Sequence, residues 1–208
     1  MKTFTKEMQD NISPQEAIEK LVEGNLRFTQ NMSINRNFLQ QAEETESGQY
    51  PFAVILSCID SRAPTEIIFD QGIGDIFNIR IAGNIINEDI LGSMEFGCKV
   101  AGAKLIVVLG HTHCGAIKGA CDDVEMGNLT ALIKKIKSSV ESEKSIQENR
   151  SSSNPDFVSK VTKINVNASI EGIVEKSPIL KEMVEEGKIN ILGAMLDIST
   201  GKVSLLDS

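Results

Sequence analysis

Both histidines of this 208-residue chain lie within three residues of a cysteine, in the segment HTHCG that starts at His111. His111 stands three residues before Cys114, and the aliphatic run KLIVVLG comes directly before it. That run is too short to span a membrane and is typical of a fully buried parallel strand. Open α/β sheets bind ligands beyond the carboxyl ends of their strands, so an imidazole and a thiol stand where chemistry is expected.

A second apolar run, residues 52–57, ends in a similar way, in the segment CIDSR. Thiolate and imidazole are ligands that zinc prefers, and a catalytic zinc site typically has three protein ligands and one open position. Each motif alone is a weak signal, because a cysteine that closes a buried strand is usually a core residue. Together, Cys58, His111 and Cys114 predict one metal site. His113 either belongs to that site or is simply exposed on the turn.

An aspartate and an arginine follow Cys58 at intervals of two residues. Asp60 could act as a fourth ligand or as an acceptor for a water on the metal. Arg62 can form a bidentate ion pair with that carboxylate and hold it away from the metal. A closed structural zinc site normally shows four cysteine or histidine ligands, so this set favours catalysis. The other cysteines, Cys98 and Cys121, lack ligand spacing, and we expect them in the core.

The rest of the chain predicts one α/β domain with helices around a mostly parallel sheet. Ser13, Pro14 and Glu16 form a capping box that predicts a helix over Pro14–Thr29. Further strands are predicted at 75–81, 104–110, 188–196 and 202–206, and further helices at 90–101, at 115–120 and within 128–187. Apolar residues that we expect to pack in the first two of these helices, 14–29 and 90–101, are Ala17, Leu21, Val22, Phe28, Leu91, Met94, Phe96 and Val100.

Length and charge limit the classes of function. The length favours one domain, and we find no internal repeat. The chain has 21 basic and 29 acidic side chains, a net charge of −8, and no basic patch, so we expect no nucleic-acid partner. It has neither an apolar run near the ~20 residues of a membrane helix nor the apolar core of a signal peptide. We expect a cytoplasmic protein without a membrane partner, although a leader already removed would leave no trace.

The segments CIDSR and HTHCG together resemble the paired zinc motifs of β-class carbonic anhydrases, C-x-D-x-R and H-x-x-C-G. The resemblance covers most of the chain, including EGNLRF, IFNIRIAGN and GAIKG. It implies an enzyme with one Zn²⁺ per subunit that interconverts carbon dioxide and bicarbonate. By match to the family, Cys58, His111 and Cys114 are the zinc ligands, and Asp60 with Arg62 is the catalytic dyad.

The same resemblance implies a set of substrate-binding residues. Gln49 matches a glutamine with which plant-type members hydrogen-bond the substrate. Phe77, Ala82 and Phe96 match positions that line an apolar pocket in that group. Gly115 matches a position whose backbone N–H faces a substrate oxygen. Three positions depart from the plant type: Ile81 replaces an asparagine, Phe96 replaces a tyrosine and so lacks its hydroxyl, and His113 stands where a smaller residue is often found.

The family fold implied is a parallel-centred sheet with an antiparallel edge strand, here preceded by a helical arm over about residues 1–48. The resemblance also implies a homodimer, or a tetramer of dimers, in which the neighbouring subunit completes the pocket. Some members place the aspartate on zinc with the help of a bicarbonate pocket that uses a tryptophan, an arginine and a tyrosine. This chain has Arg80 where that arginine would lie, but it has no tryptophan and carries Ile55 at the tryptophan position. We therefore predict the plant-type, open-site subgroup, with Asp60 paired to Arg62.

Three other functions fit parts of the pattern. The motifs do not distinguish carbon dioxide from carbonyl sulfide or carbon disulfide, so a hydrolase of these sulfur analogues is an alternative. A non-catalytic zinc scaffold needs only the ligands, and Asp60, Arg62 and Gln49 argue against it. Thiol redox chemistry is disfavoured because the chain has no C-x-x-C pair.

Overall fold

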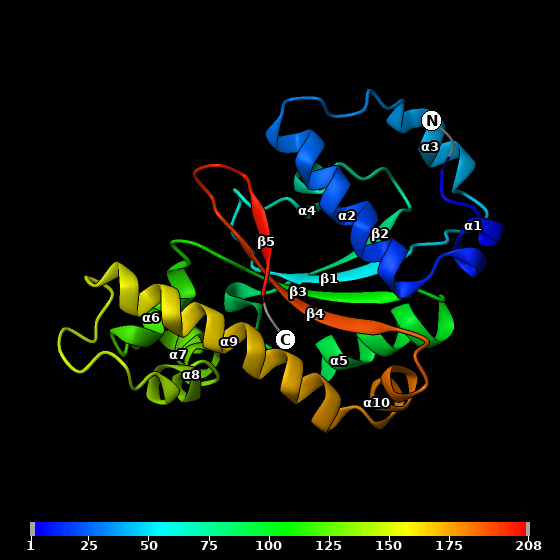
Figure 1. Ribbon diagram of the computed structural model, residues 1–208. Coiled ribbons are helices and arrows are strands. Elements are labelled where there is room, and N and C mark those ends of the chain that lie inside the picture. Colours follow the sequence, from blue (N-terminus) through cyan, green and yellow to red (C-terminus); the bar gives the residue numbers. More distant parts are fainter. Residues whose placement is uncertain (1–2, 207–208) are drawn as a thin grey trace.

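The computed structural model describes residues 3–206 and shows a five-stranded sheet between two layers of helices (Figure 1). The first two and last two residues of the expected domain lie outside the described part. The strands are β1 Ala53–Ser57, β2 Ile76–Arg80, β3 Leu105–His111, β4 Asn190–Leu196 and β5 Val203–Leu205. Their order is β2-β1-β3-β4-β5, and only the β4–β5 pair is antiparallel. The predicted fold class, with its antiparallel edge strand, is confirmed.

The helices are α1 Lys6–Asn11, α2 Pro14–Thr29, α3 Phe38–Glu44, α4 Thr65–Ile68, α5 Glu88–Glu95, α6 Gly115–Cys121, α7 Gly127–Lys134, α8 Lys137–Ser142, α9 Pro155–Lys176 and α10 Pro178–Glu185. The helix predicted over Pro14–Thr29 is confirmed together with its capping box, in which Ser13 Oγ accepts from Glu16 N at 3.2 Å and Glu16 Oε2 accepts from Ser13 N at 2.8 Å. None of these helices is both long and apolar enough to cross a membrane.

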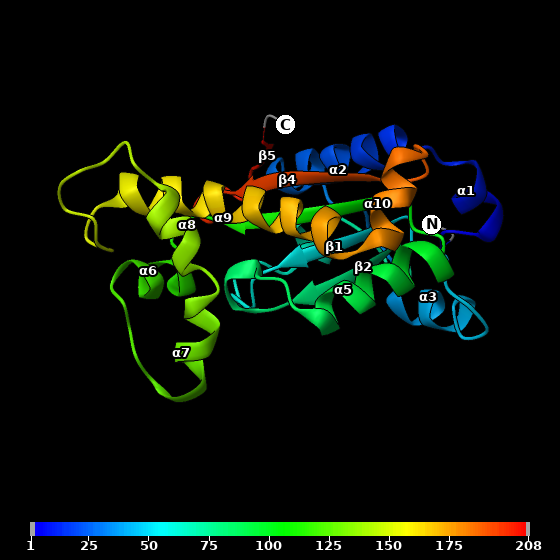
Figure 2. The ribbon, with the colours of Figure 1, turned by 90° about the horizontal axis from the view of Figure 1, so that it is seen from below.

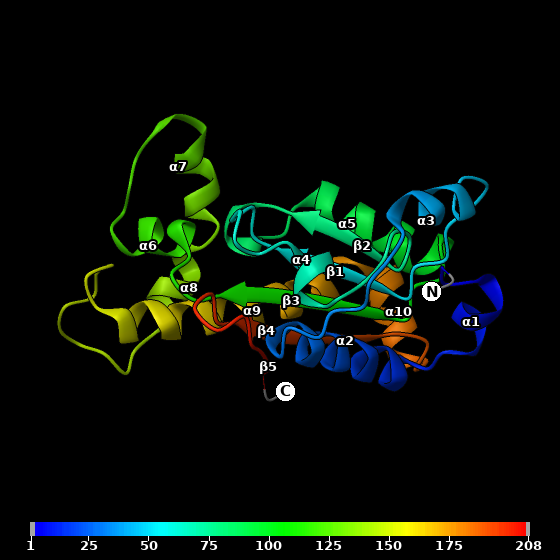
Figure 3. The same cartoon turned by 90° about the horizontal axis from the view of Figure 1, so that it is seen from above.

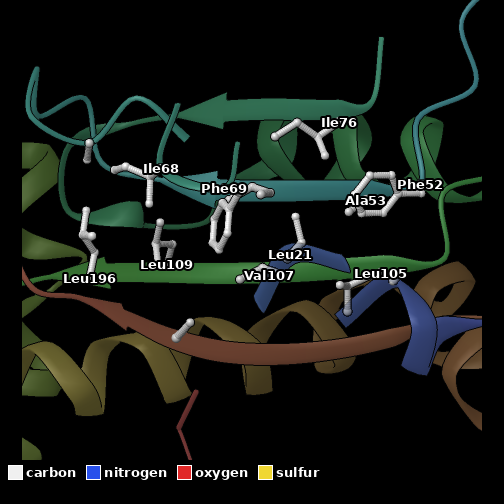
Figure 4. Packing of buried hydrophobic residues seen from close by; sticks show 14 of the residues in the cluster. Leu21, Phe52, Ala53, Ile68, Phe69, Ile76, Leu105, Val107, Leu109 and Leu196 are labelled. Carbon is white, nitrogen blue, oxygen red and sulfur yellow. The ribbon is translucent and has the colours of Figure 1, made fainter. Parts of the chain in front are cut away.

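Successive residues of each strand face opposite helical layers, as the two-residue repeat of a strand requires. Helices α2 and α4 cover one face, where Ala53 and Ile55 of β1 are buried; α5, α9 and α10 cover the other, where Val54 and Leu56 are buried (Figures 2 and 3). Figure 4 shows Leu21 of α2 in the first of these cores, close to β3. Both β1 and β3 are buried at every position, as the apolar runs predicted.

A third buried cluster lies beyond the carboxyl ends of β1 and β3. Helices α6, α7 and α8 and the start of α9 enclose it, at the left of Figure 2. It joins apolar side chains such as Ile117 and Ile136 to the thiols of Cys58 and Cys114. This cluster therefore fixes the surroundings of the cysteines that the sequence singled out.

Three apolar residues that we expected to pack are exposed. Val22 lies one position past Leu21 on α2, and so turns about 100° away from the sheet. The helix predicted at 90–101 begins earlier, at Glu88, and changes at Phe96 into a π-helical turn, Phe96–Val100. This turn leaves Phe96 54% and Val100 71% exposed.

Two leucine truncations test the assignment of the core. Leu105 in β3 is 0% exposed and Leu39 in α3 is 80% exposed. Leu105→Ala should cost roughly 3 kcal/mol of unfolding free energy and lower the melting temperature by roughly 10 °C, whereas Leu39→Ala should stay within about 0.5 kcal/mol. Thermal melts followed by circular dichroism measure both. Equal losses in the two variants would contradict the packing described here.

Candidate metal centre

Cys58, His111 and Cys114 meet at the carboxyl edge of the sheet. Cys58 directly follows β1, His111 ends β3, and Cys114 directly precedes α6. The register that pairs Ser57 with Leu109 brings the two strand ends side by side. The two Sγ atoms are 3.9 Å apart, and the three potential ligand atoms all lie within 4.8 Å of one another. All three side chains are buried.

This cluster fits a zinc ion. Two sulfurs on a tetrahedral zinc, each at ~2.3 Å, lie ~3.8 Å apart, close to the separation observed. The Nδ1 atom of His111 is 2.9 Å from Thr112 O, so Nδ1 carries the proton and donates it, and Nε2 keeps its lone pair. Nε2 is buried and has no hydrogen-bond partner within the described residues. A buried polar atom without a partner is costly, and a cation at this position would satisfy it.

The thiols of Cys58 and Cys114 are hydrogen-bonded to each other, with their Sγ atoms 3.9 Å apart. This hydrogen bond lowers the pKa of Cys58, although burial opposes the shift. The same hydrogen bond and burial both raise the pKa of Cys114. These directions favour a thiolate at Cys58 and a thiol at Cys114, and a buried thiolate attracts a cation. Metal binding would release the thiol proton.

A backbone N–H supports the Cys58 sulfur, and the sequence analysis missed it. The 3-10 turn Ala82–Asn84 follows β2, and Gly83 N donates to Cys58 Sγ at 3.4 Å. Gly83 has φ +69°, and a Cβ there would lie 2.6 Å from Ile136 Cδ1, so glycine is needed on both grounds. Asn165 of α9 holds the turn by donating to Gly83 O at 2.9 Å. A glycine beyond the end of β2 was the only sequence signal for this contact.

Asp60 and Arg62 form the ion pair that their spacing suggested. Asp60 Oδ1 accepts from Arg62 N at 3.0 Å and from Arg62 Nε at 2.9 Å, and Asp60 Oδ2 accepts from Arg62 Nη2 at 2.7 Å. The hydrogen bonds from Arg62 hold the pKa of Asp60 well below its usual value, although partial burial opposes them. Asp60 is thus ionised and directed to Arg62, beside the three-residue cluster but outside it.

Ala82 and Gly115, two of the five predicted substrate-binding residues, lie beside the cluster. Ala82 precedes Gly83, and Gly115 is the first residue of α6. Apart from its chain neighbours and its own helix backbone, no atom lies within 4 Å of a Cβ built on Gly115, so the space on that side of its Cα is open. His113 is exposed on the turn with φ +59° and lies outside the cluster.

A single chain does not bring Gln49, Phe77 or Phe96 to the cluster. Gln49 precedes β1, whose ladder already includes Phe52. The extended chain from Phe52 to Cys58 covers ~20 Å. Even if the three residues from Gln49 to Phe52 folded back along β1, they would cover at most ~10 Å of that distance, so Gln49 does not reach Cys58. Phe77 pairs with Val54 near the start of β1, and its ring centroid is 6.3 Å from that of Phe96.

Known proteins resemble the chain in sequence and in structure. Residues 53–203 match the family model described as carbonic anhydrase. The chain is 32% identical over 206 residues to carbonic anhydrase 2 of Mycobacterium tuberculosis, an alignment that covers 95% of each chain. It is 40% identical over 121 residues to a carbonic anhydrase of Mycolicibacterium smegmatis, covering 57% of this chain and 58% of that one. A solved β-carbonic anhydrase of Aspergillus fumigatus superimposes with a TM-score of 0.71 at 25% identity, covering 93% of this chain and 90% of that chain.

Replacing Cys58 should abolish metal binding. Cys58→Ser puts a hydroxyl, a poor zinc ligand, in place of a thiolate, so the purified chain should lose its zinc. Cys98→Ser changes a buried thiol in the core and should keep one zinc per chain. Elemental analysis after dialysis measures the metal content of both variants. Zinc at the wild-type level in Cys58→Ser would remove Cys58 from the ligand set.

Proposed function

This chain belongs to the β-class carbonic anhydrases, and from that premise we propose that it hydrates carbon dioxide reversibly at one zinc ion per subunit. The proposed ligands are Cys58, His111 and Cys114. The observation that carries the proposal is their buried cluster, in which an imidazole nitrogen without a hydrogen-bond partner among the described residues lies within 4.8 Å of two cysteine sulfurs. The products would be bicarbonate and a proton.

Zinc in this cluster would supply a Lewis acid, which makes water a nucleophile near neutral pH. The chain's own contribution is to orient that nucleophile. Asp60 Oδ1 accepts two hydrogen bonds from Arg62, but Oδ2 accepts only one. Oδ2 therefore keeps a lone pair that can accept a hydrogen bond from the attacking water, while Arg62 keeps the carboxylate ionised. The N–H of Gly115 would donate to a substrate oxygen on which negative charge develops.

We also assign the chain to the plant-type, open-site subgroup. Two observations support this assignment. Asp60 is engaged with Arg62 through three hydrogen bonds, and Ile55, where other members have tryptophan, is fully buried within β1. An aspartate held in this way leaves the fourth position of a three-ligand zinc site to water, substrate or product.

A second copy of the chain would supply Gln49, Phe77 and Phe96 to the site. Strand β2 lies at an edge of the sheet, and an unpaired edge is a ready site for association. Phe96 is exposed beside it, Val100 is exposed at the end of the π-helical turn, and Ile59, inside the loop that carries Cys58, is 61% exposed. We propose a homodimer, or a tetramer of dimers, built from single-domain chains with an N-terminal helical arm, in which the partner covers these side chains.

Replacing Asp60 should separate metal binding from turnover. Asp60→Asn should keep zinc but lower kcat for carbon dioxide hydration by roughly 100-fold, because an amide can donate its hydrogen bond in the wrong direction. Asp89→Asn, an exposed aspartate of α5, serves as the matched control and should keep its rate. Stopped-flow hydration assays of both zinc-loaded variants measure this. A wild-type chain that turned over only carbonyl sulfide or carbon disulfide would replace the proposed substrate.

A shared pocket should allow two inactive variants to restore activity. Gln49→Ala spoils the contribution to the partner's site, and Cys58→Ser spoils the chain's own site. Mixed dimers contain one site with all its parts, so unfolding and refolding the two together should recover roughly a quarter of the sites. A mixture of Asp60→Asn with Cys58→Ser is the control and should recover nothing, since both residues serve the same chain's site. Equal rates in the two mixtures would refute the shared pocket.

A further inference from the structure

Arg80, the last residue of β2, holds the loop that carries Cys58 and Asp60. Its Nε donates to Cys58 O at 3.1 Å, and its Nη2 donates to Asp60 O at 2.6 Å. Among residues 3–206 no carboxylate forms an ion pair with Arg80. The guanidinium of Arg80 therefore acts on two backbone carbonyls of the candidate site.

The sheet register explains why Arg80 reaches this loop. Arg80 pairs with Ser57, the last residue of β1, and Ile81 N donates to Ser57 O at 3.0 Å. Residues 58–62 then leave the sheet, so the strand ladder does not continue to the carbonyls of Cys58 and Asp60. Asp60 O accepts from Ala63 N at 3.0 Å within the loop, and Arg80 adds a second bond to this carbonyl as well as its bond to Cys58 O. A guanidinium carries several N–H donors in a rigid fork and can satisfy both carbonyls at once. Its charge strengthens each bond.

Two arginines thus hold Asp60 at two different points. Arg62 binds the carboxylate, and Arg80 binds the carbonyl. Only Ile59 separates Asp60 from Cys58 in the chain, so the carboxylate lies near enough to compete for a metal bound by Cys58. Turning it towards the metal would break the bonds from Arg62, and the bond from Arg80 would oppose any rotation of the Asp60 peptide that brought the carboxylate closer to the metal.

We propose that Arg80 is a positioning residue that keeps the Asp60 carboxylate paired with Arg62 and off the metal. Without Arg80 the loop could rotate, and the carboxylate, which is an acceptable zinc ligand, would occupy the fourth position. The inference rests on the proposed function, because a free fourth position matters only if Cys58, His111 and Cys114 hold a metal.

The test uses the full chain loaded with cobalt(II), which accepts zinc ligands and has a visible spectrum that depends on its ligand set. Azide, added as a small anion, should change the wild-type spectrum by binding at the fourth position. Arg80→Gln should keep one cobalt per chain but bind azide at least about tenfold more weakly, because Asp60 now competes for that position. Lys99→Gln, which removes an exposed charge from the π-helical turn, should bind azide like the wild type.

Two further variants separate positioning from loss of charge and from general damage. Arg80→Lys keeps the charge but lacks the fork that bonds both carbonyls, so it should also weaken azide binding. Adding Asp60→Asn to Arg80→Gln should restore azide affinity to that of Asp60→Asn alone, because the competing carboxylate is gone. A merely structural role of Arg80 would weaken azide binding whichever residue stands at position 60.

The outcomes are distinct. Azide affinity within about twofold of wild type in Arg80→Gln overturns the proposal, as does a tenfold loss that persists in the double variant. If Arg80→Gln does not fold, the azide affinity of Arg80→Lys, alone and combined with Asp60→Asn, is judged by the same limits. A folded wild-type chain that binds no cobalt overturns the proposed metal site, and with it the role of Arg80. A wild-type chain that binds cobalt and azide normally, beside Arg80 variants that also do so, overturns the role of Arg80 alone.

Discussion

The candidate site depends on one constraint: two thiols and an imidazole from separate parts of the chain must meet within 4.8 Å in the protein interior. Burying a thiolate and an unpartnered imidazole nitrogen costs free energy, so the surrounding fold has to hold them there. It does so through the parallel pairing of β1 with β3, whose ends carry Cys58 and His111. A shift by one residue would turn one of these side chains to the opposite face. The apolar packing on both faces of the sheet therefore also maintains the metal cluster.

Charge at the site is balanced by donors that lie close to it. The Cys58 sulfur accepts from Gly83 N, and the Asp60 carboxylate accepts from Arg62. Without these donors, two negative groups two residues apart in sequence would repel each other and raise each other's pKa. Each negative group is instead satisfied by its own partner. In the proposed mechanism the thiolates can then hold a metal while Asp60 remains available to orient water.

The sequence predicted what local patterns encode and missed what distant segments build. The start of helix α2 could be predicted because its capping box lies within four positions. The meeting of Cys58, His111 and Cys114 could be predicted because both motifs close apolar runs. The bonds from Asn165 to Gly83 and from Arg80 to Cys58 O join residues 82 and 22 positions apart, and no spacing rule reveals them. The apolar pattern also predicted that Phe96 and Val100 pack in the core. It could not show that both side chains are exposed in a single chain.

The geometry of a parallel strand links assembly to the proposed chemistry. Gln49 and Cys58 lie at opposite ends of β1, and no rearrangement of loops within one chain shortens a strand. If Gln49 contacts substrate, it must therefore reach the site of another copy. Such a copy could lie against β2, because this strand forms an edge of the sheet and stands beside the exposed ring of Phe96. Strand β2 also ends in Arg80, the residue that we propose positions Asp60. The same strand would then position Asp60 within its own subunit and present an apolar surface to its neighbour, so a change at β2 should affect both.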